Sequence, residues 1–378
     1  MTASREIFID SRILTAPLAG SGNFLLNAIR GFAEHLPGLT FRLVGNRSFN
    51  PEVVETLKAF ANVTMQLYLK PPRGLPGFLW SAFQVGWLAR LRQPLLYWGP
   101  NFVIPLGSLA PVPTLLTVLD LGFIDVRDTM SFGNRMLIPF YVRAIRKTDR
   151  YLVISDFTRS QLVHHFPEAS GKPTFLLSGY NSWVFRRDSF LEADREQIRQ
   201  NRIGLPGRIL LFVGSCEPRK NIPFLLSLMP RLARHDCSLA IVSGYSWGNT
   251  GINSILSSPG FPSNRVKFIR ISGFHDLATL YHACDAYVST SKYEGLGMPQ
   301  LEAMACGLPV VSPRNSSMIE IVDGAGLTVE GWDQDIWVQT ILASMDRREE
   351  LQARQAERLK LFTWESISRR FAGFLGVR

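Results

Sequence analysis

The chain has 378 residues, of which 46% are hydrophobic and 19% charged, values typical of globular proteins. It is longer than one hydrophobic core usually organises, so we expect two domains. No stretch approaches eighteen uninterrupted apolar residues, and acidic residues stand near the N-terminus where a signal peptide would have its apolar core. The composition argues against a membrane-spanning or secreted protein, and we expect a cytoplasmic one.

The net charge of +10 is unevenly shared between the two halves of the chain. Residues 1–180 contain 18 Lys and Arg against 11 Asp and Glu, an excess of +7. A basic half suits either nucleic acid or an anionic membrane surface. Because no nucleic-acid-binding motif accompanies the charge, we expect no nucleic-acid partner and favour peripheral contact with the inner face of the cytoplasmic membrane.

Apolar runs alternate with helical patterns through the first half. The expected strands are Ile7–Ile9, Phe41–Val44, Val63–Leu69, Leu95–Trp98, Thr114–Leu119, Tyr151–Ile154 and Thr174–Leu177. The first strand leads to its helix through an expected glycine turn, Gly20-Ser21-Gly22, and Ser155 is the expected N-cap of a later helix. This rhythm predicts a doubly wound α/β domain over residues 1–180.

The segment Leu75–Arg92 is unusually rich in aromatic residues. Its aromatic residues are Phe78, Trp80, Phe83 and Trp87, and the basic residues that flank or end it are Lys70, Arg73, Arg90 and Arg92. A helix of this kind could lie in a membrane interface. It could equally be a core helix of the first domain, because its apolar residues are spread over more than one face. Both interpretations stay open.

Residues 181–207 are charged, contain a Pro-Gly pair and show no sustained apolar period, so we expect a linker there. The α/β rhythm then restarts and predicts a second domain over residues 208–362. Its expected strands are Arg208–Gly214, Leu239–Ser243, Val266–Ile269 and Ala286–Ser289. The last segment, residues 363–378, is amphipathic and is expected to form a C-terminal helix.

Two glutamates of the second half, Glu294 and Glu302, are separated by seven residues. Between them, Gly295 and Gly297 can bring backbone N–H groups close to a ligand. A helix expected to begin near Pro299 would present unsatisfied N–H donors that suit a diphosphate. The two carboxylates could then accept hydrogen bonds from sugar and ribose hydroxyls, so the stretch suggests a nucleotide sugar.

The same glutamates have a plainer interpretation. Glu294 could be a solvated loop charge and Glu302 an exposed charge in the first turn of a helix, the commoner fate of a single Glu. Spacing alone leaves both interpretations open.

A metal site is not expected. Asp333-Gln334-Asp335 matches a D-x-D pattern that can hold a metal ion, but it stands at the front of a helical pattern, where acidic residues complement the helix dipole. The four cysteines have no zinc-like spacing and are expected to be buried thiols.

Two motifs carry a resemblance to a known family. Residues 293–311, YEGLGMPQLEAMACGLPVV, resemble the E-x7-E signature of retaining glycosyltransferases of GT-B family 4. Residues 217–221, EPRKN, resemble an element of the polysaccharide-assembling members, among them mannosyl- and rhamnosyltransferases. The resemblance is strongest over residues 208–320. It implies a GT-B fold, with two Rossmann-like domains facing one another across a cleft and the C-terminal helix packing back on the first domain.

The resemblance also implies roles for single residues. Lys220 and Arg219 would stabilise the leaving diphosphate, while Glu294 would engage the donor sugar and Glu302 the ribose. The other implied donor-binding residues are Gly22 in the first domain, Gly273 and Phe274 beside the nucleobase, and Gly295, Leu296, Gly297 and Met298. Many relatives have an arginine directly after the strand glycine, where this chain has Ser215, so the clamp on the phosphates would rest on Arg219 and Lys220.

The chain departs from the family pattern at one further position. The strand of the first domain that usually ends in a His-Asp pair here ends in Leu119-Asp120. Asp120 remains the first-domain candidate for contact with the acceptor, while the imidazole expected near the reacting sugar is replaced by an apolar side chain.

The implied activity is retaining transfer of a hexose from a nucleoside-diphosphate sugar to a hydroxyl of a lipid-linked or saccharide acceptor in surface polysaccharide synthesis. GDP-mannose or a deoxyhexose donor is favoured, and no metal or other cofactor is expected. The alternative, motivated by Leu119, is a nucleotide-sugar-binding protein with impaired catalysis. A Rossmann oxidoreductase is excluded, because no G-x-G-x-x-G joins the first strand to its helix.

Overall fold

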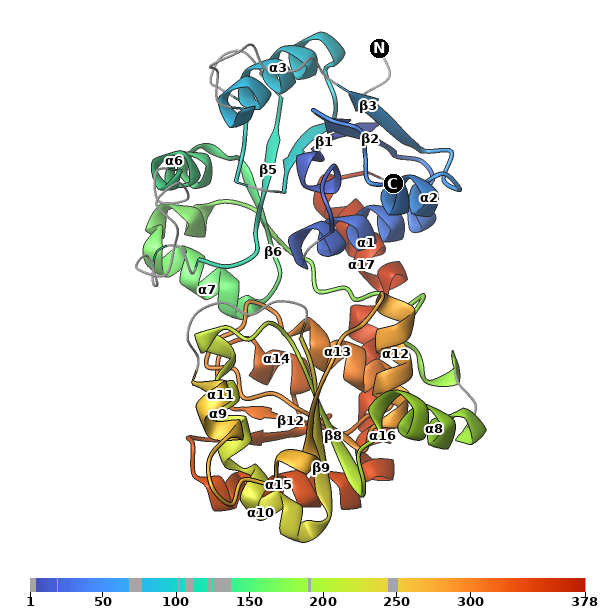
Figure 1. The fold of residues 1–378 in the computed structure, drawn as a ribbon. Coiled ribbons are helices and arrows are strands. Elements are labelled where there is room, and N and C mark those ends of the chain that lie inside the picture. Colours follow the sequence, from blue (N-terminus) through green and yellow to red (C-terminus); the bar gives the residue numbers. More distant parts are fainter. Residues whose placement is uncertain are drawn as a thin grey trace. The chain divides into compact units, whose positions relative to one another are not determined.

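The computed structural model describes residues 5–18, 20–67, 77–100, 102–105, 112–121, 124, 137–189, 192–243 and 251–377. The chain forms two units, residues 1–179 together with 364–378, and residues 180–363 (Figure 1). Each unit contains one parallel sheet with helices packed on it, which confirms the prediction of two Rossmann-like α/β domains. Among the described residues, no helix combines the length and the apolar character needed to cross a membrane.

The first unit is built on a seven-stranded sheet in the order β3-β2-β1-β4-β5-β6-β7, and every pairing is parallel. The strands are β1 (Glu6–Asp10), β2 (Thr40–Gly45), β3 (Val63–Leu67), β4 (Leu96–Gly99), β5 (Thr114–Val118), β6 (Arg150–Val153) and β7 (Thr174–Leu176). All seven match predicted strands, although residues 68–69 of the predicted third strand lie outside the described residues. The strand order reverses between β1 and β4, which makes the sheet doubly wound.

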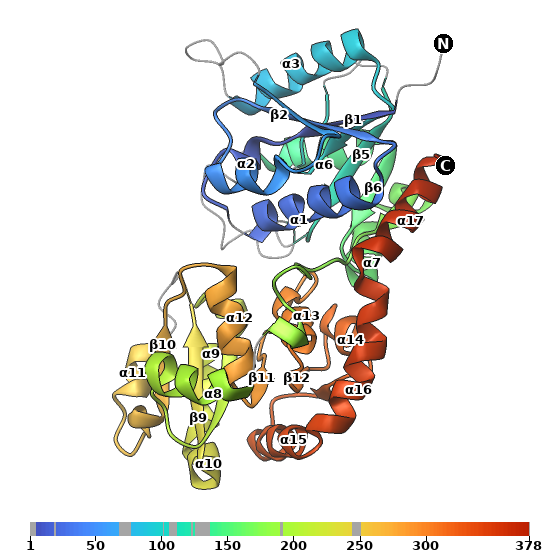
Figure 2. The ribbon, with the colours of Figure 1, turned by 90° about the vertical axis from the view of Figure 1, so that its right-hand side faces the viewer.

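Helices cover both faces of this sheet. They are α1 (Gly20–His35), α2 (Pro51–Leu57), α3 (Gly77–Arg92), α6 (Ile138–Lys147), α7 (Asp156–His165) and α17 (Trp364–Leu375). Neighbouring residues of β4 point to opposite faces: Tyr97 belongs to the core cluster that contains Ala89 of α3, whereas Trp98 meets Phe32 of α1 with ring centroids 6.1 Å apart. Figure 2 shows α1 and α3 on opposite sides of the sheet. Burial of both faces explains why the strands are apolar at nearly every position.

The C-terminal helix α17 packs within the first unit, although it follows the second unit in the chain. Its first residue, Trp364, occupies space that only glycine leaves open. A Cβ at Gly31 of α1 would lie 2.2 Å from the Trp364 ring, and one at Gly179 would lie 2.6 Å from it. Further along α17, Phe371 stacks on Phe32 with ring centroids 4.3 Å apart. Both glycines are therefore required by the docking of this helix.

The glycine turn predicted at Gly20-Ser21-Gly22 is instead the first turn of α1. Gly22 is buried there, and a Cβ on it would lie 3.2 Å from the Leu18 side chain and 3.4 Å from the Ile13 carbonyl oxygen. Close packing at the start of a helix explains the glycine, and helix formation continues through it because the following residues supply an apolar face.

The second unit has a six-stranded parallel sheet in the order β10-β9-β8-β11-β12-β13. Its strands are β8 (Arg208–Val213), β9 (Cys237–Val242), β10 (Val266–Ile269), β11 (Ala286–Val288), β12 (Val310–Pro313) and β13 (Leu327–Val329). The first four were predicted, and β12 and β13 extend the sheet beyond the prediction. Its α-helices are α8 (Glu192–Ile198), α9 (Ile222–Ser227), α10 (Met229–Leu232), α11 (Ile252–Leu256), α12 (Phe274–Ala283), α13 (Met298–Ala305), α14 (Met318–Val322), α15 (Gln334–Asp346) and α16 (Arg348–Leu359).

Residues 181–207, expected as a linker, fold with the second unit and contain α8. Arg195 and Arg199 each place a guanidinium nitrogen 2.6 Å from the Asp285 carboxylate, one on each oxygen. Asp285 also accepts the backbone N–H of Ile209 at 2.6 Å, which ties this contact to the start of β8. Charged residues that resemble a linker in the sequence thus attach α8 to the sheet.

Candidate functional site

Three loops of the second unit meet at one edge of its sheet. They follow β8, β11 and β12, which are neighbours in the strand order. Because the strands are parallel, their carboxyl ends lie at the same edge. The winding of the chain reverses between β8 and β11, and ligands of open α/β sheets collect at such a switch point.

Glu294, in the loop after β11, is buried and is the centre of this convergence. Lys220, from the loop after β8, donates a hydrogen bond to its Oε1, and Arg219 donates from Nη1 to its Oε2 at 2.8 Å. Two residues after β12 hold its backbone: Ser316 Oγ accepts the Glu294 N–H at 3.2 Å, and Ser317 Oγ donates to its carbonyl at 2.8 Å. The interpretation of Glu294 as a solvated loop charge is therefore wrong.

The two cations determine the charge state of Glu294. Burial by itself would raise the pKa of this carboxyl, but the positive charges of Lys220 and Arg219 outweigh that cost and hold the pKa below its ordinary value. Burial opposes the charge of Arg219 too, and the carboxylates of Glu294 and Glu217 reverse the effect and raise its pKa. Glu294 and Arg219 are therefore both charged at neutral pH.

The Lys220 side chain is buried and follows a path left open by a glycine. A Cβ at Gly214 would lie 3.3 Å from Lys220 Cε and 3.5 Å from its Nζ. Thr290 Oγ1 donates to the Lys220 carbonyl at 3.1 Å, which attaches the loop after β8 to the loop after β11. The space at Gly214 and the hydrogen bond from Thr290 therefore together fix the position of Lys220 beside Glu294.

Arg219 is held differently, by a short relay of polar side chains. Ser215 Oγ donates to Glu217 Oε1 at 2.7 Å, and Arg219 Nε donates to Glu217 Oε2 at 2.8 Å. The Arg219 side chain is 44% exposed, so part of the guanidinium faces solvent while Glu294 and Glu217 fix its orientation. Ser215 thus supports Arg219 indirectly.

The loop after Glu294 ends where α13 begins. Gly297 adopts a left-handed conformation, with φ 89°, and a Cβ on it would lie 2.7 Å from Gln300 Oε1. Leu296 is buried, whereas Gly295 and Met298 are half-buried. Pro299 occupies the first turn, as predicted. The loop after β11 therefore leads directly into the first turn of α13.

Glu302 lies on α13, is buried, and has no basic partner among the described residues that contact it. Tyr281 of α12 donates its hydroxyl to Glu302 Oε2 at 3.0 Å. Burial raises the pKa of Glu302 to about 7, and the hydrogen bond from Tyr281 offsets only part of that effect. The alternative of an exposed helix charge is therefore wrong for Glu302 as well.

The loop predicted to receive a nucleobase leads into α12. Gly273 is the N-cap residue and Phe274 the first residue of the helix, and Phe274 packs edge-on against Phe185 with ring centroids 6.0 Å apart. Asp276 closes the loop by accepting from the Ser272 N–H at 3.0 Å. Gly273 has an extended backbone, and a Cβ on it would meet no atom within 4 Å. The chain's own packing thus gives no reason for glycine here.

The first-domain candidates lie in the other unit. Asp120 is exposed just after β5, and Leu119 before it is half-buried. The Leu119 carbonyl accepts from Thr158 Oγ1 of α7 at 3.5 Å. Gly22 lies in the first turn of α1. The structure brings Glu294, Lys220 and Arg219 together within the second unit.

The D-x-D pattern is engaged in helix capping. Asp333 is the N-cap of α15, and its Oδ1 accepts from the N–H groups of Asp335 and Ile336 at 2.9 and 3.0 Å. Asp335 forms an exposed ion pair with Arg231 at 2.9 Å. Both carboxylates therefore have structural partners that their position at a helix start explains.

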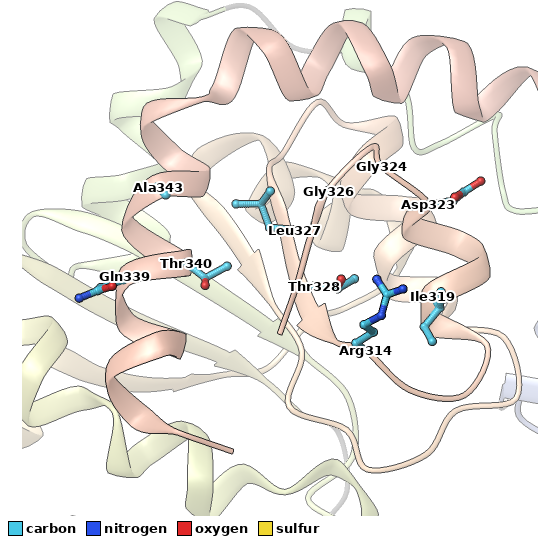
Figure 3. Close-up of a pocket in the computed structure, with 10 residues that line it drawn as sticks. All are labelled: Arg314, Ile319, Asp323, Gly324, Gly326, Leu327, Thr328, Gln339, Thr340 and Ala343. Carbon is cyan, nitrogen blue, oxygen red and sulfur yellow. The ribbon is translucent and has the colours of Figure 1, made fainter. Parts of the chain in front are cut away.

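A cavity of about 600 Å³ lies elsewhere in the second unit, beside the edge strand β13 and between α14 and α15 (Figure 3). Its lining residues are Arg314, Ile319, Asp323, Gly324, Gly326, Leu327, Thr328, Gln339, Thr340 and Ala343. None of the residues predicted to bind a donor lines it. The candidate site is therefore defined by the convergence at Glu294 and not by this cavity.

Two functional candidates escaped the sequence analysis as individual residues. Glu217 stands inside the EPRKN string, and its spacing of two from Arg219 could have suggested the pairing. Tyr281 gave no signal, because its contact with Glu302 joins two residues that are 21 positions apart and lie on different helices.

The fold is shared with solved structures, among them a glycosyltransferase. HepE of Anabaena (Alr3699/HepE), in complex with UDP and glucose, has a TM-score of 0.72 at 17% identity, with 98% of this chain and 99% of that chain covered. WaaG, a glycosyltransferase involved in lipopolysaccharide biosynthesis, has a TM-score of 0.65 at 17% identity, with 98% of this chain and 99% of that chain covered. The two parallel-sheet units therefore define the GT-B class of fold.

Sequence comparison matches part of the chain to a family and nearly all of it to a relative. Residues 207–347 match the family described as Glycosyl transferases group 1. O-antigen chain mannosyltransferase B of Escherichia coli is 29% identical over 379 residues, covering 96% of this chain and 97% of that protein. A D-inositol 3-phosphate glycosyltransferase of Streptosporangium roseum is 28% identical over 310 residues, covering 78% of this chain and 66% of that protein. The second unit thus contains a glycosyl transferases group 1 domain, and these similarities indicate a glycosyltransferase.

Proposed function

We propose that this protein is a retaining glycosyltransferase that moves a hexose from a nucleoside-diphosphate sugar to a hydroxyl of a lipid-linked or saccharide acceptor in surface polysaccharide synthesis. The observation that carries the proposal is the convergence of Lys220 and Arg219 on the buried Glu294 at the switch point of the second sheet. A diphosphate needs fixed positive charge, and a sugar needs a hydrogen-bond acceptor held in place. This cluster supplies both.

Lys220 and Arg219 stabilise the departing diphosphate in the proposed reaction. Negative charge grows on the leaving group as the bond to the anomeric carbon breaks, and cations already in position need little reorganisation to meet it. One such donor contributes about 3 kcal/mol to the transition state. Glu294 keeps both cations oriented before the donor arrives, and its carboxylate accepts hydrogen bonds from sugar hydroxyls.

The rest of the donor follows the loops around this cluster. Glu302 accepts from the ribose hydroxyls, and the backbone of residues 295–298 lies along the diphosphate at the start of α13. The nucleobase lies against the main chain at Gly273 and Phe274. The absence of any intramolecular contact that requires glycine at position 273 supports this placement, since a base lying close to the main chain leaves no room for a Cβ.

GDP-mannose or a GDP-linked deoxyhexose is the proposed donor. The likeness to O-antigen chain mannosyltransferase B over nearly the whole chain supports a mannose-like sugar and a polysaccharide acceptor. The structure of HepE contains UDP and glucose, so UDP-glucose is the donor to test beside GDP-mannose. The proposal includes no metal or other cofactor, because Lys220 and Arg219 supply the positive charge.

The test measures sugar transfer and donor hydrolysis with GDP-mannose and UDP-glucose. Glu294→Gln and Lys220→Ala should each lower kcat by at least about 100-fold, the size of effect typical of one lost electrostatic contact. Lys360→Ala is the matched control, because it removes the same charge from an exposed ion pair with Glu357. Unchanged rates in Glu294→Gln and Lys220→Ala proteins that are folded would remove the assignment.

Leu119 favours a second candidate, a nucleotide-sugar-binding protein with impaired catalysis. An apolar side chain at this position provides no donor or acceptor beside the reacting sugar. Calorimetric binding of a nucleotide sugar together with no turnover on lipid-linked acceptors would support this candidate. Transfer that appears only in Leu119→His would assign the loss to this position.

A further inference from the structure

The cavity beside β13 contains polar side chains that the fold itself does not use. Arg314, Thr328 and Gln339 line it, and none of these side chains has a hydrogen bond or an ion pair with the residues that the structure describes. In Figure 3 the Arg314 guanidinium extends toward Thr328. The cavity volume of about 600 Å³ is in the range of sites that hold small organic ligands. One ligand could therefore engage all three groups.

The polar groups of the lining both donate and accept hydrogen bonds. The guanidinium of Arg314 only donates, whereas the Gln339 amide and the Thr328 hydroxyl do both. Thr340 Oγ1 donates to the Ile336 carbonyl at 2.7 Å and keeps its lone pairs for an incoming donor. Because a hydroxyl group is itself a donor and an acceptor, this mixture matches a ligand that has several hydroxyl groups.

The charges of the lining favour a neutral ligand over an anion. Arg314 is the one cation among the lining residues, and Asp323 is the one anion. Asp323 also forms an ion pair with Arg358, which is not part of the lining, at 3.0 Å. A neutral ligand with hydroxyl groups can bond to both Arg314 and Asp323, whereas an anion would gain the first and be repelled by the second.

Apolar side chains complete the lining. They are Ile319 of α14, which is 37% exposed, Leu327 of β13 and Ala343 of α15. Figure 3 shows the Leu327 side chain pointing toward α15. A hexose ring has C–H groups beside its hydroxyl groups, so it can pack on these side chains while its hydroxyl groups make hydrogen bonds.

We propose that this cavity is a second saccharide site, which binds a short neutral oligosaccharide of hexose units and is separate from the donor site at Glu294. Arg314, Thr328 and Gln339 make hydrogen bonds to its hydroxyl groups, and the apolar side chains of α14, β13 and α15 pack on its rings.

The cavity adjoins the segment that holds Glu294. Arg314 and Ile319 both line the cavity. Between them in the chain, Ser316 accepts the Glu294 N–H at 3.2 Å and Ser317 donates to the Glu294 carbonyl at 2.8 Å. A saccharide in the cavity therefore contacts both ends of this segment. Its identity as part of the saccharide that the enzyme extends rests on the proposed function, but the binding itself does not.

The experiment measures the binding of mannotriose and maltotriose to the full chain by NMR titration, without a donor. The wild type should bind at least one of them. Arg314→Ala/Thr328→Val should bind it at least about tenfold more weakly, as expected for the loss of two hydrogen bonds. Arg270→Ala is the matched control, because Arg270 is also exposed and unpaired among the described residues but follows β10, at the opposite edge of the sheet.

Lys220→Ala separates the two sites. This variant should bind the trisaccharide as the wild type does, whatever happens to sugar transfer. Binding that is lost in Lys220→Ala but kept in Arg314→Ala/Thr328→Val would overturn the inference and leave the proposed function standing. The inference would also be overturned if the wild type bound neither trisaccharide, or if it bound mannose 6-phosphate more tightly than mannotriose and lost that preference in Arg314→Ala.

Discussion

Glu294 and Glu302 are both buried, but the charges around their carboxyl groups differ. Glu294 contacts two cations, and its pKa is held below the ordinary value despite burial. Glu302 has burial without a cation, and its pKa is raised to about 7. The two residues belong to one sequence motif, yet only one of them is an obligatory anion at neutral pH. The spacing of a motif therefore predicts where a carboxyl group lies, while the residues around that group determine its charge.

The largest effect on stability is expected from substitution of Glu294. Glu294→Ala leaves Lys220 buried without its carboxylate, and we expect the free energy of unfolding to fall by about 3–5 kcal/mol, measured by urea denaturation. Lys220→Met/Glu294→Leu removes both charges together, so it should recover most of that stability while activity stays lost. A double variant as unstable as Glu294→Ala would show that the ion pair is not the reason.

A smaller effect concerns the pH dependence at Glu302. The folded-state pKa is above the unfolded value of about 4.5, so its protonated form stabilises the fold at low pH and this contribution is lost as the pH rises through about 7. Glu302→Gln has no titrating carboxyl group at this position, so it should not show this loss of stability. The stability of wild type relative to this variant should therefore fall by roughly 2–3 kcal/mol between pH 5 and pH 8.

Chemical denaturation at both pH values measures this difference. The Glu294 pair has the opposite sign, because a lowered pKa contributes stability that is lost as the pH falls. If the stability of the wild type and that of Glu302→Gln changed by the same amount between pH 5 and pH 8, the raised pKa of Glu302 would be contradicted.

Tyr281→Phe tests the surroundings of Glu302 with a smaller change. It removes the hydroxyl that donates to Glu302 and should cost about 1 kcal/mol. The cost should be greater at pH 8 than at pH 5, because the hydrogen bond favours the ionised carboxylate. Thermal unfolding at the two pH values measures it, and an equal cost at both would mean that the hydroxyl does not act through the charge of Glu302.

The smallest expected effect lies at the edge of the charged cluster. Glu217→Gln weakens the support of Arg219 but keeps the shape of the side chain, so we expect a loss of about threefold to tenfold in kcat/KM and under about 1 kcal/mol in stability. Ser215→Ala, one step further from Arg219, should lose less. A greater loss in Ser215→Ala than in Glu217→Gln would contradict the relay from Ser215 to Arg219.

Much of the fold could be predicted from the sequence, and the exceptions have physical reasons. Strands such as β1 and β9 are runs of apolar residues, because both faces of a doubly wound sheet are buried. The edge strand β13, Leu327–Val329, has only three residues and gives no such run. The helix α8 has a charged sequence and attaches through Asp285, about ninety residues away, so nothing local distinguishes it from a linker.

The candidate site was predictable to the same degree. The motifs identified Glu294, Lys220 and Arg219, because each lies in a string with its own spacing. The partners that determine their charge come from other segments: Ser316 and Ser317 follow β12, and Tyr281 belongs to α12. Such contacts depend on the strand order, which a single sequence does not contain.

The central claim is that Lys220 and Arg219 bind a diphosphate, and the most direct test compares the affinity of a nucleoside diphosphate with that of its nucleoside by calorimetry. With guanosine ligands, and with uridine ligands as the parallel set, the wild type should prefer the diphosphate by at least about 100-fold. Lys220→Ala should lose at least about tenfold of this preference while its nucleoside affinity stays unchanged. A preference for diphosphate that is the same in Lys220→Ala and wild type would contradict the account.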